Sequence, residues 1–172
     1  MNIKKLNIKK ISYEIITTLL LILIVPNIIS CIRQPKLDSN ILPRIQAEFI
    51  DKNKFDSSNI KDATIIHFWA LWCPTCKLET SNIESVSKDV NVITIAVNSG
   101  SDSDIQEFMT KNKLTFKVIN DSQSKLANKF NVEMFPTTFI YDKNQELKFS
   151  EVGYTSTAGL KARMLWIEKS GK

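Results

Sequence analysis

Residues 68–79 read FWALWCPTCKLE and contain two cysteines separated by two residues. They continue a β-branched and aromatic run, Ala63–Ala70, of the kind found in buried strands. The sequence Pro74–Lys88 is typical of a helix, and proline is tolerated in the first turn of one. The pattern therefore predicts that Cys73 and Cys76 lie where a buried strand passes into a helix.

This position gives the cysteine pair a chemical role. Free backbone N–H groups and the positive end of the helix dipole would favour the thiolate form of Cys73. Cys76, about one turn later, is expected on the inner side of the helix, where a reversible disulfide can form. We expect Cys73 to be the exposed, attacking sulfur and Cys76 to be the buried, resolving one.

A structural zinc site and two inert buried cysteines are the alternatives. A closed zinc site needs four ligands, but the one other cysteine, Cys31, lies in an N-terminal apolar run and the one histidine, His67, lies on the strand. Inert cysteines would leave the strand–CxxC–helix context unexplained. We therefore predict no metal, and no cofactor beyond a redox-active Cys73–Cys76 disulfide.

The rest of the sequence alternates between strand-like and helix-like segments. It predicts strands near 45–50 and at 90–97, 115–119, 137–141 and 146–152, and helices at 101–111, 122–130 and 157–169. This alternation is typical of an α/β fold with a central sheet and helices on both faces. The turn residues 142–145 predict that the last two strands pair antiparallel, which makes the sheet mixed.

The N-terminus carries a targeting signal. Residues 15–32 contain no charge, follow four lysines, and are near the lower length limit for crossing a bilayer, although Pro26 and Asn27 weaken the apolar run. The lysines should stay in the cytoplasm, so the rest of the chain would be exported. We favour an uncleaved signal anchor. A lipoprotein signal, with residues 28–31 resembling a lipobox and Cys31 as the lipidation site, and a cleaved signal peptide are the alternatives.

Charge argues against a nucleic-acid partner. The chain has 23 basic and 18 acidic residues, and removing the four N-terminal lysines and Glu14 leaves 19 and 17. The folded part is therefore close to neutral, without the basic stripe of a nucleic-acid-binding domain. Only four glycines are present, and no glycine-rich phosphate loop occurs.

Two segments resemble a known family. FWALWCPTCKLE resembles the active-site segment of thioredoxin-like proteins, and FPTTF at 135–139 resembles their cis-proline segment. The 60 residues from Cys76 to Pro136, the N-terminal anchor and the Cys-Lys-x-Glu continuation look like the TlpA/ResA/CcmG (DsbE) branch, which carries an extra strand–helix insertion. The similarity covers roughly residues 45–170.

The resemblance implies a thioredoxin fold and a membrane-anchored thiol–disulfide oxidoreductase that faces the periplasm. Its parts would be an anchor or lipoprotein signal at 1–32, a linker at 33–44 and a thioredoxin-like domain at 45–172. Such proteins usually reduce disulfides of partner proteins, including apocytochrome c, and draw electrons from a membrane donor. A disulfide oxidase or isomerase, or a redox or binding module related to copper tolerance, is the alternative.

The resemblance also implies roles for individual residues. Pro136 matches the cis-proline, whose backbone would lie beside the disulfide and pair with a substrate strand. Trp72, Pro74 and Thr75 complete the motif, and Thr75, in place of the histidine of strong oxidants, favours a more reducing couple.

Two further residues have open roles. His67 takes the place of a buried acid of small thioredoxins; it could accept a proton from Cys76, although a strand histidine held by hydrogen bonds is favoured. Glu79 matches an acidic residue of the branch, but its position also suits a solvated helix-surface acid.

Overall fold

The computed structural model describes residues 8–32, 34–37 and 39–170. The chain forms two compact units, residues 1–33 and 34–172. In the first unit, α1 (Ile8–Ile32) contains Cys31, whose side chain lies outside the described residues. Across the described ranges, no helix has both the length and the apolar character required to cross a membrane.

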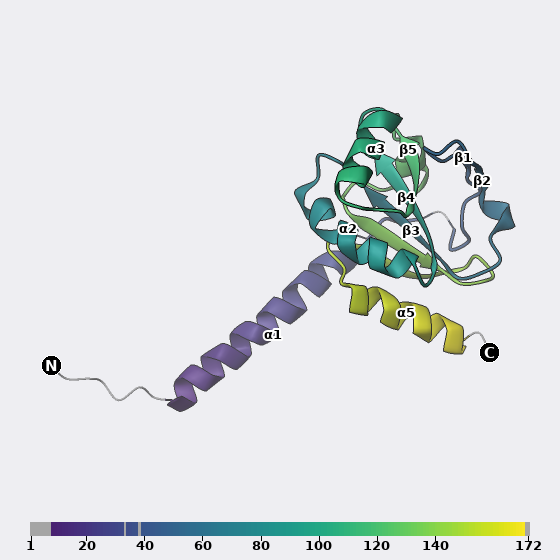
Figure 1. Ribbon diagram of the computed structural model, residues 1–172. Coiled ribbons are helices and arrows are strands. Elements are labelled where there is room, and N and C mark those ends of the chain that lie inside the picture. Colours follow the sequence, from purple (N-terminus) through teal and green to yellow (C-terminus); the bar gives the residue numbers. More distant parts are fainter. Residues whose placement is uncertain (1–7, 33, 38, 171–172) are drawn as a thin grey trace. The chain divides into compact units, whose positions relative to one another are not determined.

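A five-stranded sheet forms the centre of the second unit, in the order β5-β4-β3-β6-β7 (Figure 1). β3 pairs parallel with β4, which pairs parallel with β5, whereas β6 runs antiparallel to both β3 and β7. The predicted mixed sheet is therefore confirmed. The strands are β3 (Thr64–Trp69), β4 (Asn91–Val97), β5 (Lys117–Asp121), β6 (Thr137–Tyr141) and β7 (Leu147–Val152).

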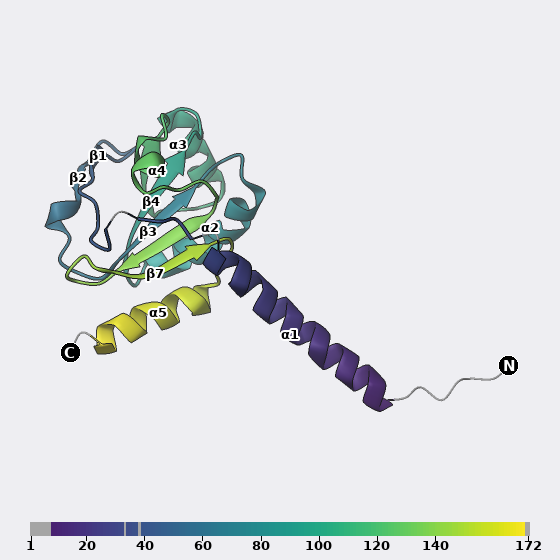
Figure 2. The same cartoon turned by 180° about the vertical axis from the view of Figure 1, so that it is seen from behind.

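Helices cover both faces of this sheet, as predicted. α2 (Pro74–Ser87), α3 (Asp102–Lys111) and α5 (Thr157–Ser170) contribute side chains to one core cluster. α4 (Lys125–Lys129), labelled in Figure 2, contributes Ala127 to the cluster on the other face. The crossovers through α2 and α3 step across the sheet in the same direction, so right-handed connections place both helices on one face.

The alternation of side chains along β3 decides what lies under α2. Ile65 and Trp69 belong to the cluster shared with α2, whereas Ile66 and Phe68 belong to the opposite cluster. Since successive strand residues point to opposite faces, His67 points to the same face as Ile65 and Trp69. The strand that leads into the CxxC thus carries its histidine on the side that α2 covers.

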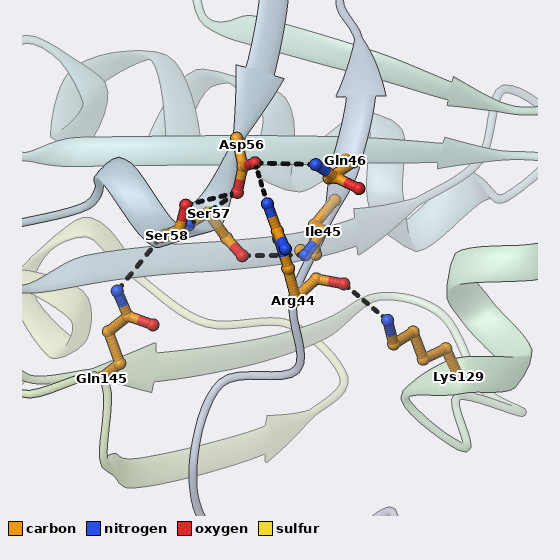
Figure 3. A network of polar contacts seen from close by, with 8 residues as sticks. All are labelled: Arg44, Ile45, Gln46, Asp56, Ser57, Ser58, Lys129 and Gln145. Carbon is orange, nitrogen blue, oxygen red and sulfur yellow. Dashed lines mark hydrogen bonds and ion pairs between the residues drawn. The ribbon is translucent and has the colours of Figure 1, made fainter.

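Residues 34–37 and 39–60 are here called the N-terminal strap, and most of their apolar side chains pack on the face that also holds α4. They include β1 (Gln46–Glu48), β2 (Lys54–Asp56) and a 3-10 turn, Ser57–Asn59. The sequence predicted a strand near β1 but missed β2. Figure 3 shows the polar contacts of this region: the Asp56 carboxylate accepts bonds from Arg44 and Gln46, and the Ser57 hydroxyl accepts the Ile45 N–H. Two further bonds fasten the strap, from Gln145 Nε2 to the Ser57 carbonyl and from Lys129 Nζ to the Arg44 carbonyl.

The strap also borders both outer strands of the sheet. At the β5 side, the Ile50 N–H donates to the Val118 carbonyl at 2.9 Å. At the start of β7, the Leu147 N–H donates to the Asn40 carbonyl, and the Leu42 N–H donates to the Gln145 carbonyl. Backbone groups that would otherwise lie open at a sheet edge are thereby paired.

Two predicted boundaries were displaced. β5 was predicted at 115–119 but spans Lys117–Asp121, and Thr115, just before it, donates both its N–H and its hydroxyl to the Glu84 carboxylate on α2. The following helix was predicted at 122–130, yet α4 begins at Lys125. Ser124, at φ 55°, is left-handed and ends a turn there.

Candidate active site

The two cysteines lie where the sequence predicts, between the end of β3 and the start of α2. The Cys73 N–H donates to the Ala70 carbonyl at 3.2 Å, which closes the turn before the helix. Parallel β3 and β4 end at the same edge, so Ser99, just after β4, reaches this turn. The buried Ser99 hydroxyl accepts the Leu71 N–H at 3.0 Å and donates to the Val97 carbonyl.

Cys73 and Cys76 form a disulfide, with their Cα atoms 5.3 Å apart. Cys73 is the N-cap residue of α2, and its Sγ accepts the Cys76 N–H at 3.1 Å. Cys73 was expected to be exposed, but the residue is only 5% exposed. Cys76 is fully buried, so Cys73 is still the more accessible of the two. The Phe135 carbonyl lies 3.7 Å from Cys73 Sγ.

The peptide bond Phe135–Pro136 is cis, as the resemblance implied. The same segment lies against the CxxC loop through side chains, since the rings of Trp72 and Phe135 meet edge to face with centroids 5.5 Å apart. Trp72 nevertheless remains 58% exposed. Pro74 and Thr75 are exposed in the first turn of α2. The outer side of the disulfide is therefore bordered by an exposed aromatic ring and a backbone carbonyl.

Glu79 is fully buried, so its interpretation as a solvated surface acid was wrong. Its Oε1 accepts the Thr155 N–H at 3.0 Å, whereas its Oε2 has no hydrogen-bond partner among the described residues. Burial raises the pKa of the Glu79 carboxyl from 4.5 to about 8, although the Thr155 bond opposes the rise. Glu79 is thus a protonated acid at neutral pH, one helical turn beyond Cys76.

His67 is 3% exposed, and its Nδ1 lies 2.9 Å from the Thr138 hydroxyl on β6. Burial lowers the pKa of the imidazole from 6.5 to about 3, because a charged ring loses its hydration there. His67 is therefore neutral at ordinary pH. This arrangement agrees with the favoured interpretation, a strand histidine held by a hydrogen bond.

Sequence reasoning missed the partners of these residues. Thr138, Ser99 and Thr155 are distant in sequence from the groups they bind, and although Thr138 lies in the FPTTF segment, that motif does not point to His67. Asn82, one turn after Glu79, was also missed. Its amide donates to the Tyr154 hydroxyl and the Thr155 carbonyl, and it accepts the Thr157 hydroxyl, so α2 fastens the loop that leads into α5.

The site contains the groups that disulfide exchange requires. A sulfur at a helix N-terminus is stabilised as a thiolate, and a second cysteine lies within bonding distance of it. The buried Glu79 carboxyl, with a pKa of about 8, can give up or take up a proton near neutral pH. Within the described ranges, no group of three or more His, Cys, Asp or Glu side chains could hold a metal ion.

A separate cavity of about 920 Å³ lies at the other end of the sheet. Its lining includes Ala63, Val90 and Asn91, next to the beginnings of β3 and β4, and Ile167 near the end of α5. β3 spans about 20 Å between this end and the CxxC. The cavity is therefore not part of the redox site.

Known proteins similar to this chain agree with the geometry of the site. Residues 39–150 match the family model described as AhpC/TSA family. A "Thioredoxin-like protein" of Haemophilus influenzae is 26% identical over 96% of this chain and 100% of its own length. The "Sporulation thiol-disulfide oxidoreductase A" of Bacillus subtilis is 30% identical over 74% of this chain and 82% of its own. Among solved structures, StoA from Bacillus subtilis superposes with a TM-score of 0.64 at 25% identity, over 72% of this chain and 97% of that one.

Proposed function

Because the chain belongs to the AhpC/TSA family and is a thioredoxin-like thiol–disulfide oxidoreductase, we propose that its Cys73–Cys76 pair reduces disulfides of partner proteins outside the cytoplasm. One observation carries the proposal. Cys73 Sγ accepts a backbone N–H at the N-terminus of α2 and lies beside the carbonyl that precedes cis-Pro136. A partner disulfide that approaches this edge meets the sulfur best able to attack it.

The reaction begins with both cysteines reduced. The Cys73 thiolate attacks one sulfur of the partner disulfide, that S–S bond breaks, and the partner's second sulfur leaves as a thiolate and takes up a proton. Cys76 then loses its proton and attacks Cys73 Sγ in the mixed disulfide, which releases the partner's first sulfur. The partner's first sulfur also takes up a proton. Two electrons have then moved from the pair to the partner, the two protons gained by the partner balance those that Cys73 and Cys76 have lost, and the Cys73–Cys76 disulfide remains.

Glu79 is proposed as the residue that exchanges a proton with Cys76. Its full burial, its unpartnered Oε2 and a pKa of about 8 support this role. A group whose pKa lies near the working pH can both take and return a proton during exchange. Trp72 and Thr75 are exposed beside the disulfide and are proposed to contact the partner, with the Pro136 segment pairing with its backbone.

The location is proposed from the sequence. The uncharged residues 15–32 behind four lysines support export, with an uncleaved anchor or a lipidated Cys31 as the tether. The proposed linker, residues 33–44, would then connect the tether to the redox domain at 45–172 and pack against that domain through Leu37 and Leu42. Cytochrome c precursors are proposed as partners, and a membrane protein as the electron donor.

The reduction potential tests the direction of electron flow. The purified protein is equilibrated in dithiothreitol buffers, and the reduced fraction is measured by thiol alkylation. We expect a value near the thioredoxin level of about −270 mV, because Thr75 supplies no positive charge to the Cys73 thiolate. A value near the DsbA level of about −120 mV would instead indicate an oxidase. Failure to reduce insulin in vitro would contradict the exchange activity itself and leave a binding module.

A further inference from the structure

β3 and β6 carry the two halves of the redox site. β3 ends at Trp69, four residues before Cys73, and β6 begins at Thr137, directly after Pro136. The strands are antiparallel, and Phe68 opposite Thr137 is the last pair before the two chains separate. Beyond that pair, the CxxC loop and the cis-proline segment each follow their own path. Their separation is therefore set by what joins the strands just below this point.

His67 and Thr138 form the next pair of the ladder. Nδ1 of His67 lies 2.9 Å from the Thr138 hydroxyl, and both side chains are buried on the face that α2 covers. A buried polar group that loses its partner is not compensated by water. The pair therefore has one low-energy arrangement, with the two side chains at hydrogen-bond distance.

We infer that His67 is a positioning residue, which acts through Thr138 to hold the CxxC loop and the cis-Pro136 segment at the separation a protein substrate requires. The inference rests on the proposed exchange reaction. The two segments meet directly above this pair, where Cys73 Sγ lies 3.7 Å from the Phe135 carbonyl. A partner protein must engage both segments at once, whereas a small disulfide needs to reach only Cys73.

The competing role for His67 is a proton acceptor for Cys76. Burial opposes it, because the pKa of the imidazole is lowered to about 3. Such a base holds a thiol proton poorly at neutral pH, since a thiol ordinarily titrates several pH units higher. A positioning role needs only the neutral ring and its bond to Thr138.

Single-turnover kinetics with two disulfides separates the roles. Reduced protein is mixed with insulin, a protein disulfide, or with dithiobis(nitrobenzoate), a small disulfide. Oxidation of the protein is followed by its tryptophan fluorescence. His67→Leu removes the bond, and Thr138→Val removes it without changing the shape of the side chain. His67→Asn is the matched control, because asparagine also carries a polar atom at the δ position.

We expect His67→Leu and Thr138→Val each to slow insulin reduction about fivefold, the effect of one net hydrogen bond. The rate of each variant with dithiobis(nitrobenzoate) should stay within about twofold of the wild-type rate. His67→Asn should restore most of the insulin rate. The double variant should be no slower than either single variant, since both remove the same bond.

Equal slowing with both disulfides, without rescue by His67→Asn, would overturn the inference in favour of the proton acceptor. Unchanged insulin rates in both single variants would show that the bond does not position the site. If His67→Leu fails to fold, Thr138→Val alone decides between these results. A wild-type protein that reacts with neither disulfide would instead refute the proposed function.

Discussion

Replacing Glu79 by glutamine should remove a pH dependence of stability that the buried carboxyl imposes on the protein. The pKa of Glu79 is raised from 4.5 to about 8 in the folded state. The folded protein therefore keeps a proton that the unfolded chain has lost between these two values. Stability from this group is fully present below pH 4.5 and is lost as the pH rises through about 8. Glutamine is neutral and of the same shape, so it carries no such dependence.

The magnitude follows from the pKa difference. Each pH unit between the two values costs about 1.4 kcal/mol of unfolding free energy, so the whole window amounts to about 5 kcal/mol at most. His67 acts in the opposite sense, because its pKa falls from 6.5 to about 3 on folding. It stabilises the protein above pH 6.5 and loses that contribution as the pH falls. The two slopes cancel between 4.5 and 6.5, and only Glu79 contributes from 6.5 to 8.

The measurement is urea unfolding of the oxidised protein, with Cys31 also replaced, so that no thiol titrates. Between pH 6.5 and 8, wild type should lose about 1.5 to 2 kcal/mol relative to Glu79→Gln. Glu107→Gln on α3 is the control, because Glu107 is exposed and its variant should follow wild type. Parallel pH profiles for wild type and Glu79→Gln would refute the reasoning, since the carboxyl would then titrate alike in folded and unfolded protein.

Four other outcomes are expected. In the reduced protein, a brief iodoacetamide pulse should label Cys73 before Cys76, as measured by mass mapping; the opposite order would reverse the assigned roles. Cys76→Ser, with Cys31 also replaced, should accumulate reductant-sensitive adducts on non-reducing gels, and adducts that persist when Cys73 is removed too would exclude the pair as the exchange centre. Alkaline phosphatase fused to the C-terminus should be active, whereas a stable but inactive fusion would place the domain in the cytoplasm. Ser99→Ala should lower the unfolding free energy in urea by about 1 to 3 kcal/mol, because the Leu71 N–H loses its partner; an unchanged value would mean that water replaces the hydroxyl.

β3 and β4 were predictable because each is a short run of mostly apolar, buried residues, whereas β6 and β7 were indicated by the turn residues 142–145 between them. β3, β4, β6 and β7 were predicted within two residues of their observed bounds. The start of β5 was not predictable from its own residues, because Glu84, some thirty positions earlier, binds the backbone at Thr115 and Phe116. β2 was missed for a different reason: it has three residues, two of them charged, and depends on pairing with β1.

The two cysteines and Pro136 could be found from motifs, but their surroundings could not. Thr138 lies opposite His67 because of the register in which β3 and β6 pair, and this register cannot be predicted from the sequence. The burial of Glu79 did leave a signal. Cys76, Glu79, Ile83 and Val86 follow one another at helical spacing, so the acid lies on the inner face of α2 with the apolar residues.

The N-terminal strap has a practical meaning for anyone who shortens this protein. Residues 40–50 look dispensable, because they precede the redox motif and carry little regular structure. Yet they pair with the chain beside β7 at one side of the sheet and with β5 at the other. A truncation that starts at β3 would uncover both outer strands together and leave a sheet able to grow by adding copies of itself. A soluble form for crystallisation or kinetics should therefore begin no later than Gln34, whose amide still binds the Ser150 carbonyl on β7.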